Sequence, residues 1–238
     1  MTATHRRRRR VAVLISGRGS NMQALVAAAR DPAYPAEIAL VLSNRADAAG
    51  LAHARAAGVP VAVVESRPFR GDREGFERAL DAELARNGIE LVALAGFMRV
   101  LTPWFVGRWQ DRLVNIHPSL LPAFPGLDTH ARALAAGVRL HGCTVHLVRT
   151  EVDAGPILAQ AAVPVLAGDT PETLAARVLA QEHRIYPAAL GWLAAGRVRV
   201  EGSRALITGA DGAADAALAS PLPEWAPLPR SADDPRED

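Results

Sequence analysis

The sequence of 238 residues contains a single cysteine, Cys143, which excludes an internal disulfide framework and any metal site built from cysteines. Long apolar runs are also missing. Segment 11–15, which follows a run of arginines, stops at Ser16 and is too short for the core of a secretory signal peptide. Segment 91–101 contains Arg99 and is far below membrane-spanning length. We therefore expect a soluble, cytoplasmic protein without a membrane partner.

Charge is concentrated at the two ends of the chain. Residues 6–10 are five consecutive arginines, whereas residues 211–238 contain seven acidic and two basic residues, a net charge of −5. The formal net charge is +2 and half of the residues are hydrophobic, as in an ordinary globular protein. We expect a basic extension over residues 1–10, a catalytic domain over 11–200 and a C-terminal extension over 201–238, disordered from about residue 221.

Short apolar runs rich in Val, Ile and Leu alternate with helical patterns, which predicts an α/β fold. Strands are expected at 11–16, 38–43, 61–64, 91–95, 113–116, 142–148 and 157–165, and helices at 21–30, 48–57, 73–86, 129–136 and 170–195. Such apolar strands indicate a doubly wound, mostly parallel sheet with a Rossmann-like N-terminal half. Asp169 or Thr170 should cap the last helix, and Pro187 should break or kink it.

A glycine-rich segment, Ser-Gly-Arg-Gly-Ser-Asn over residues 16–21, follows the first expected strand and opens the first helix. Glycines there allow backbone N–H groups to approach an anion at a helix N-terminus, and Ser20 and Asn21 can cap the helix or donate to phosphate oxygens. The segment is neither a Walker A loop nor a dinucleotide fingerprint, because Met22 replaces the third glycine. It is equally consistent with a tight turn or with a monophosphate site.

Asn115 lies in the expected strand over 113–116, and His117 follows directly after it. The two share a face, because residues i and i+2 of an extended segment point the same way. An amide beside an imidazole can stabilise an oxyanion, and Asp153 can keep that imidazole charged or move a proton. Each residue taken singly also fits a cap or a turn. A metal site at His130, His141 and His146 and a serine hydrolase are discounted, because neither recognised spacing is present.

Four segments occurring in this order carry a resemblance to a known family: Ile-Ser-Gly-Arg-Gly-Ser-Asn at 15–21, Leu-Ala-Gly-Phe-Met-Arg at 94–99, Asn-Ile-His-Pro-Ser-Leu-Leu-Pro at 115–122 and Val-Asp-Ala-Gly-Pro-Ile at 152–157. So arranged, they resemble the phosphoribosylglycinamide formyltransferase family over about residues 11–200. The resemblance implies transfer of a formyl group from 10-formyltetrahydrofolate, a co-substrate, to the amine of glycinamide ribonucleotide in de novo purine biosynthesis. It implies no metal, and it allows a homodimer.

The resemblance also implies roles for particular residues. The ribonucleotide phosphate would bind to the glycine-rich loop. The folate would bind in a pocket beside the second segment and the backbone of 149–153, and three polar side chains would catalyse the transfer. The residues are Gly17, Gly19, Ser20, Asn21 and Glu182 for the ribonucleotide, Arg73, Met98, Arg99, Val100, Leu101 and Asp153 for the folate, and Asn115, His117 and Asp153 for catalysis. Asp128 stands where some members have a histidine, so an auxiliary role there is in doubt.

Three other functions are compatible with parts of the sequence. A formyltetrahydrofolate deformylase has a similar core but usually an N-terminal regulatory domain, for which the ten residues before Val11 leave no room. A methionyl-tRNA formyltransferase adds a C-terminal tRNA-binding domain, and the residues after Val200 are too few and too acidic for one. A nucleic-acid-binding protein would use the arginine run, but the body shows no basic face or nucleic-acid motif. No specific nucleic-acid partner is therefore expected.

Overall fold

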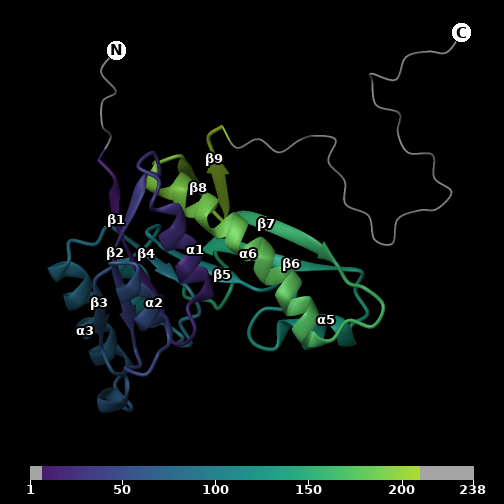
Figure 1. Cartoon of the computed structure of the whole chain (residues 1–238), viewed down its shortest axis with the longest axis horizontal. Coiled ribbons are helices and arrows are strands. Elements are labelled where there is room, and N and C mark those ends of the chain that lie inside the picture. The colour runs from purple at the N-terminus through teal and green to yellow at the C-terminus, as the bar shows by residue number, and fades with distance from the viewer. Residues whose placement is uncertain (1–6, 210–238) are drawn as a thin grey trace, which may run out of the picture.

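The computed structural model describes residues 7–209 and consists of a seven-stranded sheet, a two-stranded hairpin and surrounding helices (Figure 1). The strands are β1 (Arg9–Ile15), β2 (Ala36–Ser43), β3 (Val61–Val63), β4 (Leu91–Leu94), β5 (Leu113–His117), β6 (Leu140–Leu147), β7 (Ile157–Pro164), β8 (Val198–Glu201) and β9 (Arg204–Ile207). The helices are α1 (Ser20–Ala28), α2 (Gly50–Ala56), α3 (Arg73–Arg86), α4 (Pro103–Arg108), α5 (Thr129–Ala135), α6 (Pro171–Ala194) and the 3₁₀ turn η1 (Arg67–Phe69).

The strand order of the large sheet is β3-β2-β1-β4-β5-β6-β7. All pairs from β3 to β5 are parallel, and β6 and β7 join antiparallel. The first four strands have the Rossmann order, in which the chain reverses direction across the sheet between β1 and β4. The predicted doubly wound, mostly parallel α/β fold is confirmed.

Two hydrophobic cores cover the two faces of the sheet, as the near-continuous apolar strands predict. In β1, Val11, Val13 and Ile15 face the core shared with α1, α2 and α6, whereas Ala12 and Leu14 face the core shared with α3 and α4. The helices α1 and α6 lie side by side over the first of these cores (Figure 1). This arrangement leaves the carboxyl ends of the strands as the edge where loops can form a site.

The helix α6 covers nearly the whole of the predicted range 170–195. Thr170 is its N-cap within a capping box, with Pro171 in the first turn. Of the two expectations for Pro187, a break or a kink, the break is wrong, because α6 runs uninterrupted to Ala194. Buried residues on both sides of the proline hold the helix against the sheet, and this packing outweighs the one lost backbone hydrogen bond.

Sequence patterning missed four short elements, namely η1, α4, β8 and β9. Among residues 7–209, no helix is both long enough and apolar enough to span a membrane. The disorder expected from about residue 221 concerns residues outside those described.

Candidate active site

The carboxyl ends of β1 and β4 lie next to each other at the switch point of the sheet, where open α/β sheets bind ligands. Ser16 ties the two strand ends together. Its Oγ accepts a hydrogen bond from the backbone N–H of Met98 at 2.9 Å and donates one to Oδ1 of Asn44 at 2.6 Å. Its own N–H donates to Gly96 O at 3.1 Å. The glycine-rich loop and segment 96–101 therefore form adjoining walls of one site.

The glycine-rich loop turns into α1 through backbone geometry alone. Gly19 is the N-cap, with a left-handed φ of 73° and no side-chain cap. Of the two roles expected for Ser20 and Asn21, capping of the helix is not present, because both are already its first residues. Because Gly19 has no side chain that could accept a hydrogen bond, the first N–H groups of α1 have no side-chain cap and can donate to an anion.

Asn21 and Glu182 are connected by a hydrogen bond, although they lie far apart in the sequence. Nδ2 of Asn21 donates to Oε2 of Glu182 at 2.6 Å, which joins the start of α1 to the middle of α6. Glu182 is buried, and this burial raises the pKa of its carboxyl, while the bond from Asn21 acts in the opposite direction. The structure thus brings two of the residues expected to bind the ribonucleotide into contact.

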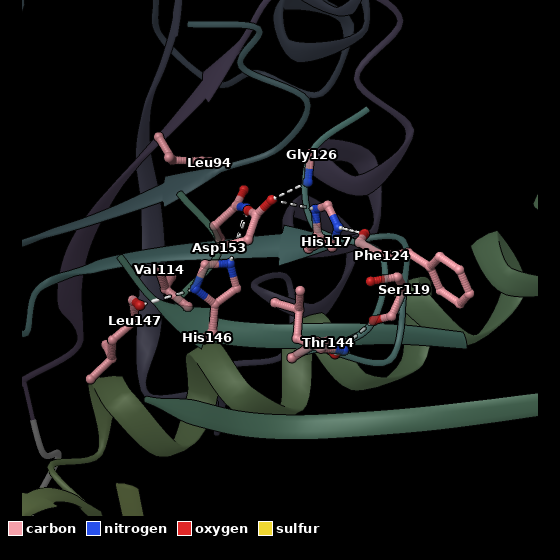
Figure 2. Close-up of polar contacts among 12 residues, drawn as sticks. Leu94, Val114, His117, Ser119, Phe124, Gly126, Thr144, His146, Leu147 and Asp153 are labelled. Carbon is pink, nitrogen blue, oxygen red and sulfur yellow. Dashed lines mark hydrogen bonds and ion pairs between the residues drawn. The ribbon is translucent and has the colours of Figure 1, made fainter. Parts of the chain in front are cut away.

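The three residues expected to be catalytic lie together at the end of β5 and in the loop after β6. Figure 2 shows His117 and Asp153 facing each other. Nδ1 of His117 is 3.3 Å from Oδ2 of Asp153, so the contact that sequence spacing left open is present. Nε2 of His117 donates to the carbonyl of Phe124 at 3.0 Å. Because both ring nitrogens face oxygen acceptors, the surroundings suit an imidazolium.

His146 joins this cluster, and sequence reasoning missed its place in it. Asp153 lies between the rings of His117 and His146 in Figure 2, with Nε2 of His146 3.7 Å from Oδ1 of Asp153. Nδ1 of His146 faces the carbonyl of Leu147 at 3.0 Å, so it carries the proton and leaves Nε2 as an acceptor. Burial lowers the pKa of His146, which favours this neutral form.

The neutral His146 fixes the amide of Asn115. Nδ2 of Asn115 lies 3.3 Å from Nε2 of His146, and the two residues pair directly across the antiparallel strands β5 and β6. Because Nε2 can only accept, the amide must present its NH₂ group there, which leaves the second N–H as a donor. Only the register of β6 against β5 could have revealed this contact.

Tight backbone contacts hold the segment that carries Asp153. Asp153 has a left-handed φ of 56°, and its Oδ2 accepts the N–H of Gly126 at 2.8 Å. Gly155 packs so closely on β6 that an added Cβ would lie 1.6 Å from the carbonyl oxygen of Leu147. Arg149 anchors the start of the segment through a 2.5 Å hydrogen bond to Oδ1 of Asp111. Asp153 therefore has little freedom to leave His117.

Most of the residues expected around the folate belong to the neighbouring segment 96–101 or contact it. Met98 and Val100 are 68% and 60% exposed, so they offer apolar surface to a ligand, whereas Leu101 is buried in the core. Arg73 donates to the carbonyl of Val100, and the Arg99 guanidinium lies 5.2 Å from the centre of the Phe76 ring. Val152, across the site on the Asp153 segment, is 55% exposed.

Asp128 and two histidines lie near the cluster of Asn115, His117, His146 and Asp153 without joining it. Asp128 is exposed and precedes α5 with a left-handed φ of 56° and no side-chain cap. His130 and His141 pack ring to ring, 5.2 Å between centres. No group of three or more metal-binding side chains occurs within residues 7–209.

Burial of His141 makes the stability of the protein sensitive to acid. Burial lowers the pKa of His141 from its usual 6.5 to about 4. The unfolded chain takes up this proton at a higher pH than the folded protein, so stability is full above pH 6.5 and falls as pH drops towards 4. Between about pH 7.5 and about pH 4.5, the free energy of unfolding of His141→Phe should fall by about 2 kcal/mol less than that of the parent protein. Urea unfolding at the two pH values measures the difference. Equal losses in both proteins would contradict the assignment.

Residues 9–190 match the family model described as formyl transferase. The chain belongs to the formyl transferase family. The match spans the glycine-rich loop, the Asn115 cluster and Glu182, so all the residues discussed above lie in the formyl transferase part of the chain.

Named relatives within the formyl transferase family are similar over most of this chain. Phosphoribosylglycinamide formyltransferase of Escherichia coli K12 is 45% identical over 199 residues, which are 84% of this chain and 93% of that protein. The trifunctional purine biosynthetic protein adenosine-3 of Gallus gallus is 51% identical over 191 residues. These are 80% of this chain but 19% of that protein, so the chain spans about a fifth of the trifunctional relatives it matches.

The crystal structure of glycinamide ribonucleotide transformylase 1 from Symbiobacterium toebii has the same formyl transferase fold. Its TM-score is 0.82 at 48% sequence identity, and the likeness covers 86% of this chain and 95% of the other.

Proposed function

We propose that this protein transfers the formyl group of 10-formyltetrahydrofolate to the amine of glycinamide ribonucleotide, in the cytoplasm, as a step of de novo purine biosynthesis. The observation that carries the proposal is the contact of His117 with Asp153 beside the oriented amide of Asn115. The 45% identity to the E. coli phosphoribosylglycinamide formyltransferase over nearly all of that protein supports the choice of substrates. A homodimer stays a prediction.

Both substrates fit the walls of the site. The ribonucleotide phosphate would lie on Gly17, Gly19, Ser20 and Asn21, at the uncapped N-terminus of α1, where backbone N–H groups and the helix dipole favour an anion. Glu182 would then bind the polar end of the same substrate. The exposed apolar side chains of Met98 and Val100 suit the flat ring of a folate. Arg73, Arg99, Leu101 and the backbone of 149–153 would complete that pocket.

The chemistry is a direct acyl transfer. The amine nitrogen attacks the formyl carbon and forms the new C–N bond, while the carbonyl electrons move to the oxygen as an oxyanion. The free N–H of Asn115 and the protonated ring of His117 stabilise this oxyanion. Collapse of the tetrahedral species breaks the bond to the folate nitrogen. No covalent bond to the enzyme forms.

Asp153 assists the proton transfer that accompanies this reaction. Its carboxylate keeps His117 charged and, through water, helps to move the proton from the attacking amine to the departing folate nitrogen. The proposed mechanism requires no metal.

His146 acts through Asn115 and is a positioning residue. His146→Phe removes the acceptor that orients the amide, so kcat should fall about tenfold with KM nearly unchanged. Combined with Asn115→Ala, it should cause little further loss of kcat, because its main effect on turnover runs through that amide. Additive losses in the double variant would contradict this role.

An absorbance assay tests the proposed function. The purified protein is mixed with 10-formyl-5,8-dideazafolate, whose deformylation changes its absorbance, with and without glycinamide ribonucleotide. Signal that requires the ribonucleotide supports the transferase. Signal without an amine acceptor supports a deformylase instead, and absence of signal in both mixtures contradicts the proposal.

A further inference from the structure

A second cavity, of about 610 Å³, lies at the amino ends of the strands, at the edge of the sheet opposite the candidate active site. Its walls come from the residues before β1, the loop between α1 and β2, and the C-terminal part of α6. Figure 1 shows the start of β1, the end of α6 and the β8–β9 hairpin at the same end of the molecule. The volume is in the range of ligand-binding clefts. The proposed reaction does not use this cavity.

The cavity combines positive charge with aromatic and proline surface. Three arginines, Arg7, Arg8 and Arg197, line it together with Tyr34 and Trp192. Arg7 forms an ion pair with Glu90, whereas the hydrogen bonds of Arg8 and Arg197 within residues 7–209 go to backbone carbonyls. Carbonyl bonds fix the direction of a guanidinium without neutralising its charge. The cavity therefore suits an acidic partner that also carries rings or prolines.

The described chain ends at the rim of this cavity. The N–H of Thr208 donates to the carbonyl of Arg197 at 2.9 Å, and Nε of Arg197 donates to Thr208 O at 2.7 Å. Nη2 of Arg197 is 3.1 Å from the place of a Cβ on Gly209. Whatever follows Gly209 in the chain thus starts beside a cavity arginine.

The sequence after Gly209 is complementary to the cavity. Residues 211–238 carry seven acidic and two basic residues, and they include the run Pro-Leu-Pro-Glu-Trp-Ala-Pro-Leu-Pro at 221–229. Proline-rich segments bind to surfaces lined by aromatic side chains, and carboxylates pair with guanidinium groups. The match to the formyl transferase family model ends at residue 190, so segment 211–238 lies outside it.

We propose that the acidic C-terminal segment 211–238 binds in this cavity of its own chain, with its carboxylates on Arg8 and Arg197 and its proline-rich run against Tyr34 and Trp192. Covalent attachment at the rim gives the segment a high effective concentration, so weak contacts suffice for occupancy. The proposal is independent of the proposed function.

A spin label on the full-length protein tests the proposal. Cys143 is fully buried, and burial raises the pKa of its thiol to about 12, so a label attaches selectively to Ala226→Cys. Paramagnetic broadening of backbone amides is then recorded, with the reduced label as reference. Broadening should be strongest at Tyr34 and Trp192 and should fall at high salt.

Variants separate specific docking from general charge attraction. Arg197→Gln should reduce the broadening at Tyr34 and Trp192 by about threefold, and Arg197→Lys should restore it. Arg55→Gln, the same charge change on the exposed side of α2, should leave it unchanged.

Three results would overturn the proposal. The first is broadening that is uniform or strongest elsewhere. The second is an equal effect of Arg197→Gln and Arg55→Gln. The third is equal broadening when the spin-labelled chain carries no isotope and is mixed with an isotope-labelled chain that lacks the spin label, because a second copy would then supply the segment.

Discussion

Asp153→Asn is expected to lower kcat for formyl transfer by about 10³-fold, the contribution of a well-placed proton-transfer group. The substitution removes the negative charge that faces Nδ1 of His117 at 3.3 Å. Without it, the charged imidazole loses its partner and the route for the amine proton is broken. Steady-state kinetics with both substrates, at saturating folate, measures the loss.

The same substitution should leave the fold intact. The amide of Asn has nearly the shape of the carboxylate, and its oxygen can still accept the N–H of Gly126. The free energy of unfolding should therefore change by less than about 1 kcal/mol. Asp31→Asn, a carboxylate-to-amide change at an exposed turn, is the matched control and should keep full activity. Turnover of Asp153→Asn close to that of this control would rule out the catalytic assignment.

Asn115→Ala is expected to lower kcat by about 10²-fold, the usual cost of removing one oxyanion donor. The donor acts only as the oxyanion develops, so KM for both substrates should change little and kcat/KM should fall with kcat. Kinetic comparison with the parent protein measures both parameters.

A loss confined to KM would assign Asn115 to substrate binding instead. Asn87→Ala provides the control, because Asn87 is an asparagine at the end of α3 that bonds Glu83 of its own helix and lies outside the site. It should retain the parent kcat, although it removes the same type of side chain.

The parallel half of the fold and the position of the site could be predicted from the sequence. Runs such as 11–15 are apolar at every position, and this pattern is typical of a strand that is buried on both faces. Asn115 and His117 could be assigned to one strand end by the two-residue period, and the family segments implied their roles. Predicted helix boundaries differed from the observed ones by one or two residues where backbone geometry alone sets the end of a helix, as at Gly19 before α1.

The contacts within the site could not be predicted, because they depend on chain reversals that leave no local pattern. His146 meets Asn115 through antiparallel register across β5 and β6, and Asp153 reaches His117 through a turn with a left-handed aspartate. The break that Pro187 could have caused did not occur, because the cost of a proline is a local property, whereas the packing that keeps α6 continuous comes from distant strands. The cavity beside Arg197 likewise forms only when the two ends of the described chain come together.

The most direct test of the central claim follows the formyl carbon itself. The protein is incubated with glycinamide ribonucleotide and 10-formyltetrahydrofolate carrying ¹³C in the formyl group, and the products are identified by carbon NMR. The account predicts that the label appears in the formamide of the ribonucleotide, at a rate that Asp153→Asn lowers about 10³-fold. Label that appears as free formate at the same rate with or without the ribonucleotide would contradict it.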